Sequence, residues 1–281
     1  MKLSELLIKA YEEKFAIGAF NIYNIESAKA VVEGAKRQDK PALLMLSEKS
    51  LNYGGFKEIV GVVEVLKKKS AQDVFLHLDH GTNINLVKEC IKAGFDSVMY
   101  DGSKLPLDQN IQISQSLRQT AHRSGVIFEA EIGRVGGRED LVNSKNFKTN
   151  PAEAKLFADQ VRPDILAVAI GNIHGRMTAA EELDFTLLSR ISDLVKRPLV
   201  LHGCSNRKPH EYKVAISTGV VKINIDTELR EAFVEGIKMA LKKKLNDPRE
   251  ILNLSSEKIS KIVEEKIDIF SCSGFKSGFK R

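Results

Sequence analysis

The chain of 281 residues has three cysteines, no tryptophan and no long apolar run. Cys90, Cys204 and Cys272 lie far apart and in no paired spacing, which argues against a disulfide framework or a cysteine zinc site and is typical of a reducing cytoplasm. No apolar run approaches the ~18 residues that a membrane span needs. Acidic and basic residues are mixed through residues 1–15, which is unlike a secretory signal. We therefore expect a cytoplasmic protein with no membrane partner.

The composition is that of a globular protein, with 43% hydrophobic and 28% charged residues. The net charge of +6 fits an anionic partner such as nucleic acid, anionic lipid or phosphorylated metabolites. However, the lysines are scattered, with triplets only at 67–69 and 242–244, and no aromatic-rich basic stretch accompanies them. A solvated lysine surface is the favoured interpretation, and no nucleic-acid partner is expected.

Eight short apolar runs alternate with amphipathic stretches along the chain. The runs are residues 16–22, 41–47, 74–79, 97–102, 126–133, 165–171, 198–203 and 220–225. Continuous apolar runs are typical of parallel strands buried on both faces. Eight such units predict a (β/α)₈ TIM barrel forming one domain over residues 1–281. A doubly wound open sheet is the alternative, and the absence of a GxGxxG turn disfavours it.

Helical spacing of apolar residues predicts helices between these strands, for example over 25–38, 85–95 and 226–245. A further helix is predicted over 255–270, after the eighth unit, and packs on the barrel or on a partner subunit. With the Gly/Ser/Lys-rich tail that follows, it forms a C-terminal extension over about residues 250–281.

Polar side chains gather where the predicted strands end, and a barrel has its active site at those carboxyl ends. They are Asn21, Ser47, Asp79, His80, Asp101, Glu129, Glu131, His174, His202, Asn224, Asp226 and Thr227. The opposite strand ends carry no comparable group. Strand ends are generally more polar than strand middles, which explains some of the asparagine and serine. It does not explain three histidines and five acids on one rim.

Three of the rim residues, His80, His174 and His202, each lie in a turn flanked by glycine. Histidine is the commonest zinc ligand, and a catalytic zinc uses three protein ligands with one position open. The trio therefore predicts a metal site at the barrel mouth. His77 lies inside a strand and is expected to be a hydrogen-bonded core residue, whereas His122 and His210 are expected on the surface or in packing.

Two further segments carry glycines. A bound phosphate would suit both of them, GNIHG at 171–175 and HGCS at 202–205, because small residues let the backbone approach a ligand. Asp226 and Thr227 begin a predicted helix, whose first N–H groups also favour an anion. The polar segment 133–150 predicts a structureless loop that acts as a mobile lid, with Gly136 and Gly137 as hinge and Glu139 swinging in. A flexible surface excursion without a role is the equal alternative.

Several ordered motifs resemble the class II, metal-dependent ketose-bisphosphate aldolases, which include the fructose- and tagatose-1,6-bisphosphate enzymes. The motifs are HLDHG, EAEIGRVGG, AVAIGNIHG, LVLHG and KINIDTELR, and the resemblance runs from about residue 18 to residue 249. It implies a (β/α)₈ barrel, a homodimer or homotetramer, and reversible cleavage of a ketose 1,6-bisphosphate to dihydroxyacetone phosphate and glyceraldehyde 3-phosphate.

The resemblance also implies roles for single residues. The three histidines hold one catalytic zinc ion per subunit; Asp79 is the acid/base at the C4 hydroxyl; Glu139 moves the C3 proton of dihydroxyacetone phosphate; and Asn224 orients the enediolate. The resemblance further implies a site for the ketose phosphate at Gly175, Gly203, Ser205, Asp226 and Thr227. Asn21 and Ser47 match positions near the far end of the substrate, and Asp101 and Glu131 match a second, resting metal position. A sodium or potassium ion is implied on backbone carbonyls near Ile173, Gly175 and Gly203.

The chemistry agrees with this assignment, because cleavage of a carbon–carbon bond leaves a carbanion that something must stabilise. A Schiff-base lysine is one solution. The strand ends named above carry no lysine, since Lys222 lies inside the last strand. A divalent metal acting as Lewis acid is the other solution.

The sequence departs from the family pattern at Cys204, Asn206 and Arg138. The segment after Arg249 also departs from it and leaves the second phosphate contact open, with Arg249 a candidate. Three other functions stay open. They are a 6-phospho-5-dehydro-2-deoxygluconate aldolase, a metal-dependent barrel hydrolase acting on phosphorylated substrates, and a non-catalytic basic binding protein.

Overall fold

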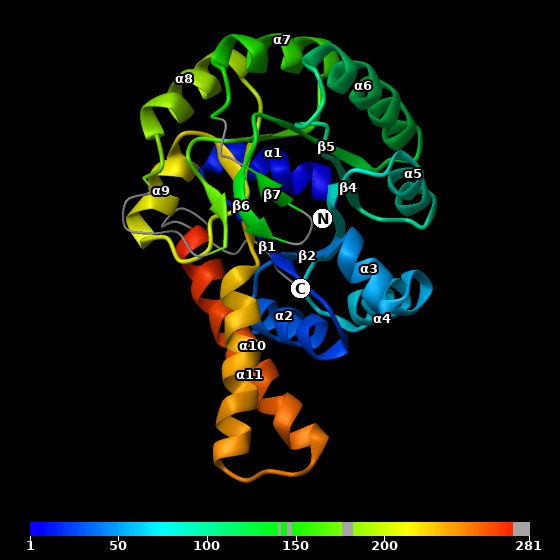
Figure 1. The fold of residues 1–281 in the computed structure, drawn as a ribbon, viewed down its shortest axis with the longest axis vertical. Coiled ribbons are helices and arrows are strands. Elements are labelled where there is room, and N and C mark those ends of the chain that lie inside the picture. The colour runs from blue at the N-terminus through cyan, green and yellow to red at the C-terminus, as the bar shows by residue number, and fades with distance from the viewer. Residues whose placement is uncertain (140–141, 145–147, 176–181, 272–281) are drawn as a thin grey trace.

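The computed structural model describes residues 1–139, 142–144, 148–175 and 182–271. At its centre is a closed barrel of eight parallel strands, in the order β1-β2-β3-β4-β5-β8-β10-β11 (Figure 1). The strands are β1 (Ile17–Asn21), β2 (Ala42–Ser47), β3 (Val74–Gly81), β4 (Ser97–Tyr100), β5 (Ile127–Ile132), β8 (Ile165–Val168), β10 (Leu199–Leu201) and β11 (Val220–Ile225). Each of the eight predicted runs forms one of them. The barrel prediction is confirmed and the open sheet is wrong.

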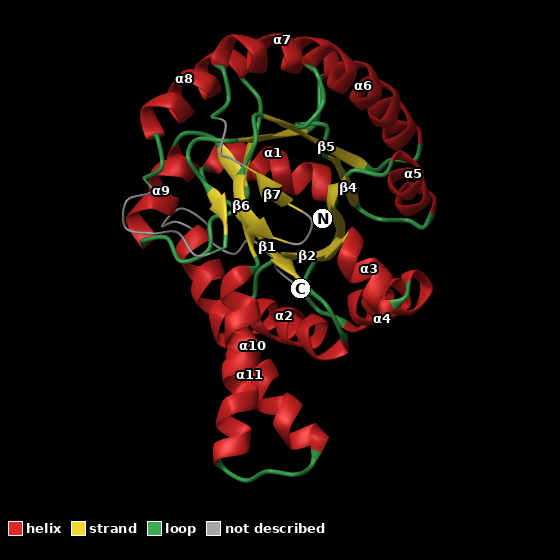
Figure 2. Ribbon diagram, viewed as in Figure 1, coloured by secondary structure: helices red, strands yellow, loops and turns green. Residues whose placement is uncertain are grey.

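Helices surround the barrel on its outside (Figure 2). They are α2 (Ile25–Gln38), α3 (Glu48–Gly54), α4 (Phe56–Lys69), α5 (Ile84–Lys92), α6 (Leu107–Arg123), α7 (Pro151–Val161), α8 (Phe185–Val195), α9 (Pro209–Ser217) and α10 (Thr227–Lys242). Side-chain oxygens of the residues before the helices start several of them by accepting first-turn N–H groups, as Asn24, Asn150 and Asp184 do. No helix in the described ranges is both long and apolar enough to cross a membrane.

The apolar core falls into two clusters that leave the carboxyl end of the barrel to polar groups. One cluster fills the space between the strands and the surrounding helices. The other combines inward-facing strand residues such as Met45 and Phe75 with Leu3, Leu6 and Leu7 of helix α1 (Leu3–Glu13). Helix α1 therefore closes the lower end of the barrel interior.

The C-terminal helix α11 (Pro248–Phe270) begins seven residues before the predicted start at 255. Proline suits the first turn of a helix, and Asp247 accepts the N–H of Arg249 there. Its last turn lies on the barrel, since the N–H of Ala16 donates to the carbonyl of Phe270 at 3.0 Å. The distal parts of α10 and α11 project from the body (Figure 1). The helix thus packs on its own barrel, and residues 272–281 of the predicted extension lie outside the described residues.

Two glycines let α11 approach its neighbours. A Cβ atom at Gly236 of α10 would lie 2.4 Å from Ser255 Cα, and one at Gly34 of α2 would lie 2.7 Å from Val263 Cγ1. We expect Gly236→Ala to lower the free energy of unfolding by about 1–3 kcal/mol, because backbone has to move to admit the methyl group. Urea denaturation measures this change. Gly61→Ala in α4 is the matched control, with no atom within 4 Å of the added Cβ. Equal stability of the two variants would contradict the close packing.

In its described part, the segment 133–150 is not the structureless loop that its composition predicts. Strand β6 (Gly136–Glu139) pairs antiparallel with β7 (Val142–Ser144) and parallel with β9 (Ile173–His174). Gly137 thereby lies opposite His174 in the register. The backbone of this glycine-rich segment finds its hydrogen-bond partners in a strand that follows β8, which local propensity does not reveal. The predicted hinge residues Gly136 and Gly137 are therefore part of a strand.

Candidate active site

The predicted rim residues, and the phosphate-site residues that the resemblance implies, lie at the carboxyl end of the barrel, and most of them are buried. Buried members are Asn21, Ser47, Asp79, Glu129, Glu131, His174, His202, Ser205, Asn224 and Asp226, whereas His80, Asp101, Gly175, Gly203 and Thr227 are partly exposed. Glu139 ends strand β6, and its side chain lies outside the described residues. Its predicted proton transfer therefore stays a prediction.

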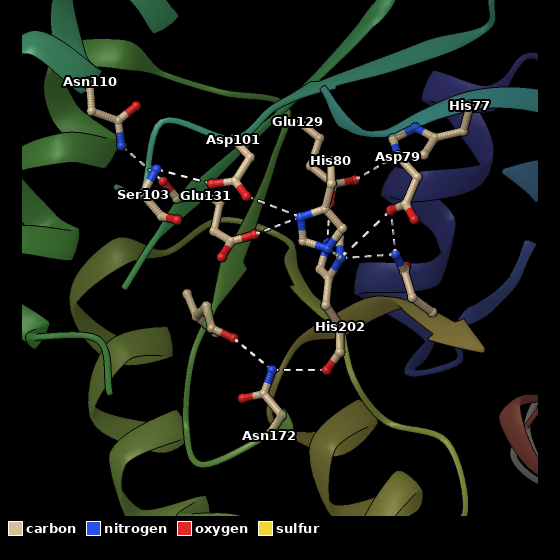
Figure 3. A network of polar contacts seen from close by, with 12 residues as sticks. His77, Asp79, His80, Asp101, Ser103, Asn110, Glu129, Glu131, Asn172 and His202 are labelled. Atoms are coloured by element: carbon tan, nitrogen blue, oxygen red, sulfur yellow. Dashed lines mark hydrogen bonds and ion pairs between the residues drawn. The ribbon is translucent and has the colours of Figure 1, made fainter. Parts of the chain in front are cut away.

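The imidazole rings of His80 and His202 lie together at the centre of this end (Figure 3), and the ring of His174 lies on another side of His80. The ring centroid of His80 lies 4.9 Å from that of His174 and 4.4 Å from that of His202. His80 Nε2 lies 2.8 Å from His202 Nδ1. His80 comes from β3, His202 follows β10, and His174 lies on β9 rather than in a turn after β8. Residues 28 to 122 positions apart thus come together, as the trio of histidines predicts.

Carboxylates surround the rings. Asp79 Oδ1 lies 3.7 Å from His202 Nδ1, and Asp101 Oδ2 lies 3.2 Å from His80 Nδ1. Glu131 Oε2 lies 3.7 Å from the same His80 nitrogen. Two sets of donor atoms are close enough to hold an ion, one formed by Asp79, His80 and His202 and one by His80, Asp101 and Glu131. The two sets share His80, and neither of them includes His174.

The electrostatics of the pocket favour a cation. Burial lowers the pKa of His80, but the negative charges of Asp79, Glu131 and Asp101 outweigh it and raise that pKa to about 10. Burial lowers the pKa of His174 to about 3 and that of His202 well below its ordinary value. The imidazoles of His174 and His202 are neutral and can donate lone pairs to a cation, and the raised pKa of His80 shows that the carboxylates around it stabilise positive charge. Imidazole nitrogens beside carboxylate oxygens are the donor set that a zinc-like divalent ion takes. The residues present therefore fit a divalent metal.

Asp79 is held by two amides. Asn21 Nδ2 donates to Asp79 Oδ2 at 3.0 Å, and Asn224 Nδ2 donates to Asp79 Oδ1 at 3.0 Å. Burial raises the pKa of Asp79, but the neighbouring His80, His202 and Lys222, together with the hydrogen bond from Asn21, lower it below its ordinary value. Asp79 is therefore an oriented carboxylate. Asn21, which the resemblance places near the far end of the substrate, lies against this carboxylate.

The predicted phosphate segments also touch each other. Gly203 has a φ of +57°, and a Cβ there would lie 2.5 Å from the backbone of Ile173. The side chain of Asn172 donates to the carbonyl of His202 at 2.9 Å (Figure 3). Ser205 Oγ accepts the N–H of Asp226 at 3.3 Å. The segments 171–175 and 202–206 and the start of α10, here termed the pocket wall, thus lie against one another beside the histidines.

Two of the departures from the family pattern, Cys204 and Asn206, have structural explanations. Tyr212 donates its hydroxyl to the carbonyl of Cys204 at 2.6 Å, so this residue anchors the turn by its backbone. Burial raises the pKa of the Cys204 thiol to about 12, so the group is a neutral packing side chain. Asn206 has a φ of +60°, a conformation that asparagine tolerates well, and its N–H donates to Glu228. Nothing is described for the side chain of Arg138.

The other histidines and Arg249 lie outside the pocket or behind it. His77 is fully buried with its Nδ1 2.9 Å from Ser97 Oγ, as the core prediction requires. His122 pairs with Asp164 at 2.9 Å on the surface, and His210 is exposed. Arg249 pairs with Asp247 beside the loop that joins α10 to α11, away from the barrel mouth (Figure 1). Arg249 therefore does not contact a phosphate in the pocket of its own chain.

Three residues of the site were not singled out for it from the sequence. Tyr23 donates its hydroxyl to Asp226, which also pairs with Arg230 at 2.5 Å. Asn172 bridges two segments of the pocket wall, and Lys222 donates to Asn224 Oδ1 at 2.8 Å. A signal was present for the last two, because a buried amide in a glycine-rich turn and a lysine inside a buried strand both need a polar partner.

Known proteins are similar to this chain over nearly its whole length. The family model described as fructose-bisphosphate aldolase class-II matches residues 1–275. A fructose-bisphosphate aldolase of Geobacillus stearothermophilus is 36% identical, with 98% of each chain covered. A sulfofructosephosphate aldolase of Alkalicoccus urumqiensis is 35% identical, with 94% of each chain covered.

Solved structures agree with the sequence comparisons. The YdjI aldolase of Escherichia coli K12 superposes with a TM-score of 0.86 at 27% identity, covering 97% of this chain and 98% of that one. The fructose-bisphosphate aldolase of Campylobacter jejuni gives a TM-score of 0.82 at 26% identity, covering 96% and 94%. Together with the barrel and the histidine–carboxylate pocket, these matches show that the chain belongs to the class-II fructose-bisphosphate aldolase family and is a metal-dependent aldolase, a lyase.

Proposed function

We propose that the protein catalyses the reversible, zinc-dependent cleavage of fructose 1,6-bisphosphate to dihydroxyacetone phosphate and glyceraldehyde 3-phosphate. The observation that carries this proposal is the convergence of His80, His174 and His202 beside Asp79, a carboxylate that two amides hold in place. Zinc is proposed because imidazole nitrogens dominate the donor set. Asp101 and Glu131 would serve a second, resting metal position with His80.

The chain's own residues have separate tasks in this reaction. When bound by the three histidines, the metal supplies Lewis-acid stabilisation of the negative charge that develops as the carbon–carbon bond breaks. Asp79 takes the proton of the C4 hydroxyl during cleavage and returns it during condensation, since its lowered pKa keeps it ionised near neutral pH. Glu139 moves the proton at C3, and Asn224 orients the enediolate through its amide.

The pocket wall would bind the phosphate of the ketose. Gly175, Gly203, Ser205, Asp226 and Thr227 lie along it, and the first-turn N–H groups of α10 suit an anion. Ser47 at the end of β2 would lie near the far end of the substrate. Backbone carbonyls near Ile173, Gly175 and Gly203 would bind a sodium or potassium ion, in keeping with the close approach of two of these segments.

A coupled assay for triose phosphates tests the substrate. Fructose and tagatose 1,6-bisphosphates are compared side by side, with and without EDTA, and a sulfofructose phosphate and 6-phospho-5-dehydro-2-deoxygluconate form further arms. We expect the highest kcat/KM for fructose 1,6-bisphosphate, loss of turnover in EDTA, and recovery when zinc is added back. A preference for another arm reassigns the substrate within the family. Release of inorganic phosphate without triose phosphates would support a hydrolase instead.

The same proposal includes a cytoplasmic location and a homodimer or homotetramer. Light scattering coupled to size-exclusion chromatography measures the oligomeric state, and a monomer at micromolar concentration would contradict that part alone.

A further inference from the structure

Two charged side chains are fully buried inside the barrel, and the proposed chemistry uses neither of them. Lys222 of β11 and Glu129 of β5 are each 0% exposed, and Lys222 Nζ lies 3.0 Å from Glu129 Oε2. Removing such a pair from water is costly, and apolar residues of the same volume often serve stability equally well or better. Stability alone therefore does not explain why an ion pair lies here.

Each partner of this pair also contacts one residue of the site. Glu129 Oε1 lies 2.8 Å from His202 Nε2 (Figure 3), and Lys222 Nζ donates to Asn224 Oδ1 at 2.8 Å. Lys222 and Asn224 are two positions apart on β11, so both side chains lie on the same face of the strand. One buried ion pair thereby connects a candidate metal ligand to the amide that holds Asp79.

The contacts determine which atoms face the pocket, because each charged partner has a single hydrogen-bonding role. A carboxylate only accepts, so Glu129 requires the proton of His202 to be on Nε2 and leaves a lone pair on Nδ1. An ammonium group only donates, so Lys222 turns Oδ1 of Asn224 toward itself and the amide NH₂ toward the pocket.

The two constraints agree with each other at the point where they meet. Asn224 Nδ2 lies 3.0 Å from His202 Nδ1 and donates to Asp79 Oδ1 at 3.0 Å. The amide NH₂ of Asn224, a donor, therefore faces His202 Nδ1, the nitrogen that Glu129 leaves free to accept. With the amide flipped, its oxygen would face both the Asp79 carboxylate and the His202 lone pair. The pair thus excludes the wrong tautomer and the wrong amide orientation together.

We propose that Glu129 and Lys222 are positioning residues of this aldolase. Glu129 sets the tautomer that makes Nδ1 of His202 a metal ligand, and Lys222 sets the orientation of Asn224 toward Asp79. The inference rests on the proposed metal role of His202, so its first readout is independent of metal and of activity.

Long-range ¹H–¹⁵N NMR on metal-free protein labelled at histidine reports the tautomer of His202. We expect the Nε2–H form in the wild type and a population of the Nδ1–H form in Glu129→Gln, because a carboxamide donates as well as accepts. Competition titration should show zinc binding weakened about 10–100-fold in that variant, as is usual when the partner of a ligating histidine is changed. Lys222→Met should retain the wild-type tautomer and lower kcat.

Lys266→Met is the matched control. Lys266 Nζ lies 2.8 Å from Glu228 Oε2 in a second buried Lys–Glu pair, which does not contact a histidine of the site. This variant should lose stability and keep the tautomer of His202 and the zinc affinity of the wild type. Equal losses of zinc affinity in Lys266→Met and Glu129→Gln would show a merely structural role and overturn the proposal.

Glu129→Gln with wild-type zinc affinity and an unchanged tautomer would also overturn the proposal. If a single variant does not fold, the double variant Glu129→Gln/Lys222→Met leaves no unpaired buried charge and should show the same tautomer change. Full zinc affinity in His202→Ala would instead refute the proposed metal site. The tautomer in metal-free Glu129→Gln would still decide the positioning role.

Discussion

Replacing His174 by alanine should abolish metal-dependent cleavage. His174 is buried beside His80, and its lowered pKa keeps the imidazole neutral and able to bind a cation at neutral pH. A Lewis acid stabilises the transition state by several kcal/mol, and each ~1.4 kcal/mol is tenfold in rate, so the loss in kcat/KM is on the order of 10³-fold or more. The coupled triose-phosphate assay and zinc analysis by mass spectrometry check both parts.

His122→Ala is the control for this variant, because that imidazole pairs with Asp164 at the surface. It should retain wild-type turnover and zinc content. Wild-type turnover in His174→Ala would contradict the assignment of the three histidines and leave the set of Asp79, His80 and His202 as the candidate ligands.

Replacing Asp79 by alanine should give a protein that binds zinc and turns over very slowly. The carboxylate lies close enough to His80 and His202 to be a ligand itself, so the variant separates two roles. As an acid/base it contributes about 10²–10⁴-fold to the rate, and kcat should fall by that factor with the metal retained. Isothermal titration with zinc and steady-state kinetics measure the two quantities.

Asp79→Asn extends this test. It keeps the shape of the side chain but removes the negative charge of the carboxylate that accepts hydrogen bonds from Asn21 and Asn224. It should bind zinc and be as slow as Asp79→Ala. Loss of zinc from both variants would make Asp79 a ligand and would require another residue to move the C4 proton.

The barrel was predictable because its signal is local. Each strand is a short run of apolar residues buried on both faces, such as Ala42–Ser47, and an amphipathic helix separates it from the next. The rim was predictable for the same reason, since strand ends such as Asp79-His80 follow directly from the strand positions. Because the parallel strands close into a barrel, their carboxyl ends come together, and no further sequence signal is needed to predict this.

Other features depend on partners that only the closed barrel supplies. Strand β6 is rich in glycine and forms because Ile173–His174 lies beside it. The role of Lys222 is not evident from its place inside a strand, because its partner Glu129 lies 93 positions earlier in the chain. The start of α11 at Pro248 was missed because the apolar spacing becomes clear only further along, while the helix-starting Asp247-Pro248 pair is a weak local signal.

The apolar floor that α1 makes with the inward-facing strand residues has a consequence for how such a protein diversifies. Apolar packing is concentrated in this floor and in the outer layer of helices, whereas the residues proposed to bind the substrate lie at the opposite end. Exchanging a partly exposed side chain around the mouth, such as Thr227, therefore leaves both apolar clusters intact. New sugar specificities can arise there one substitution at a time, while the scaffold beneath tolerates each trial.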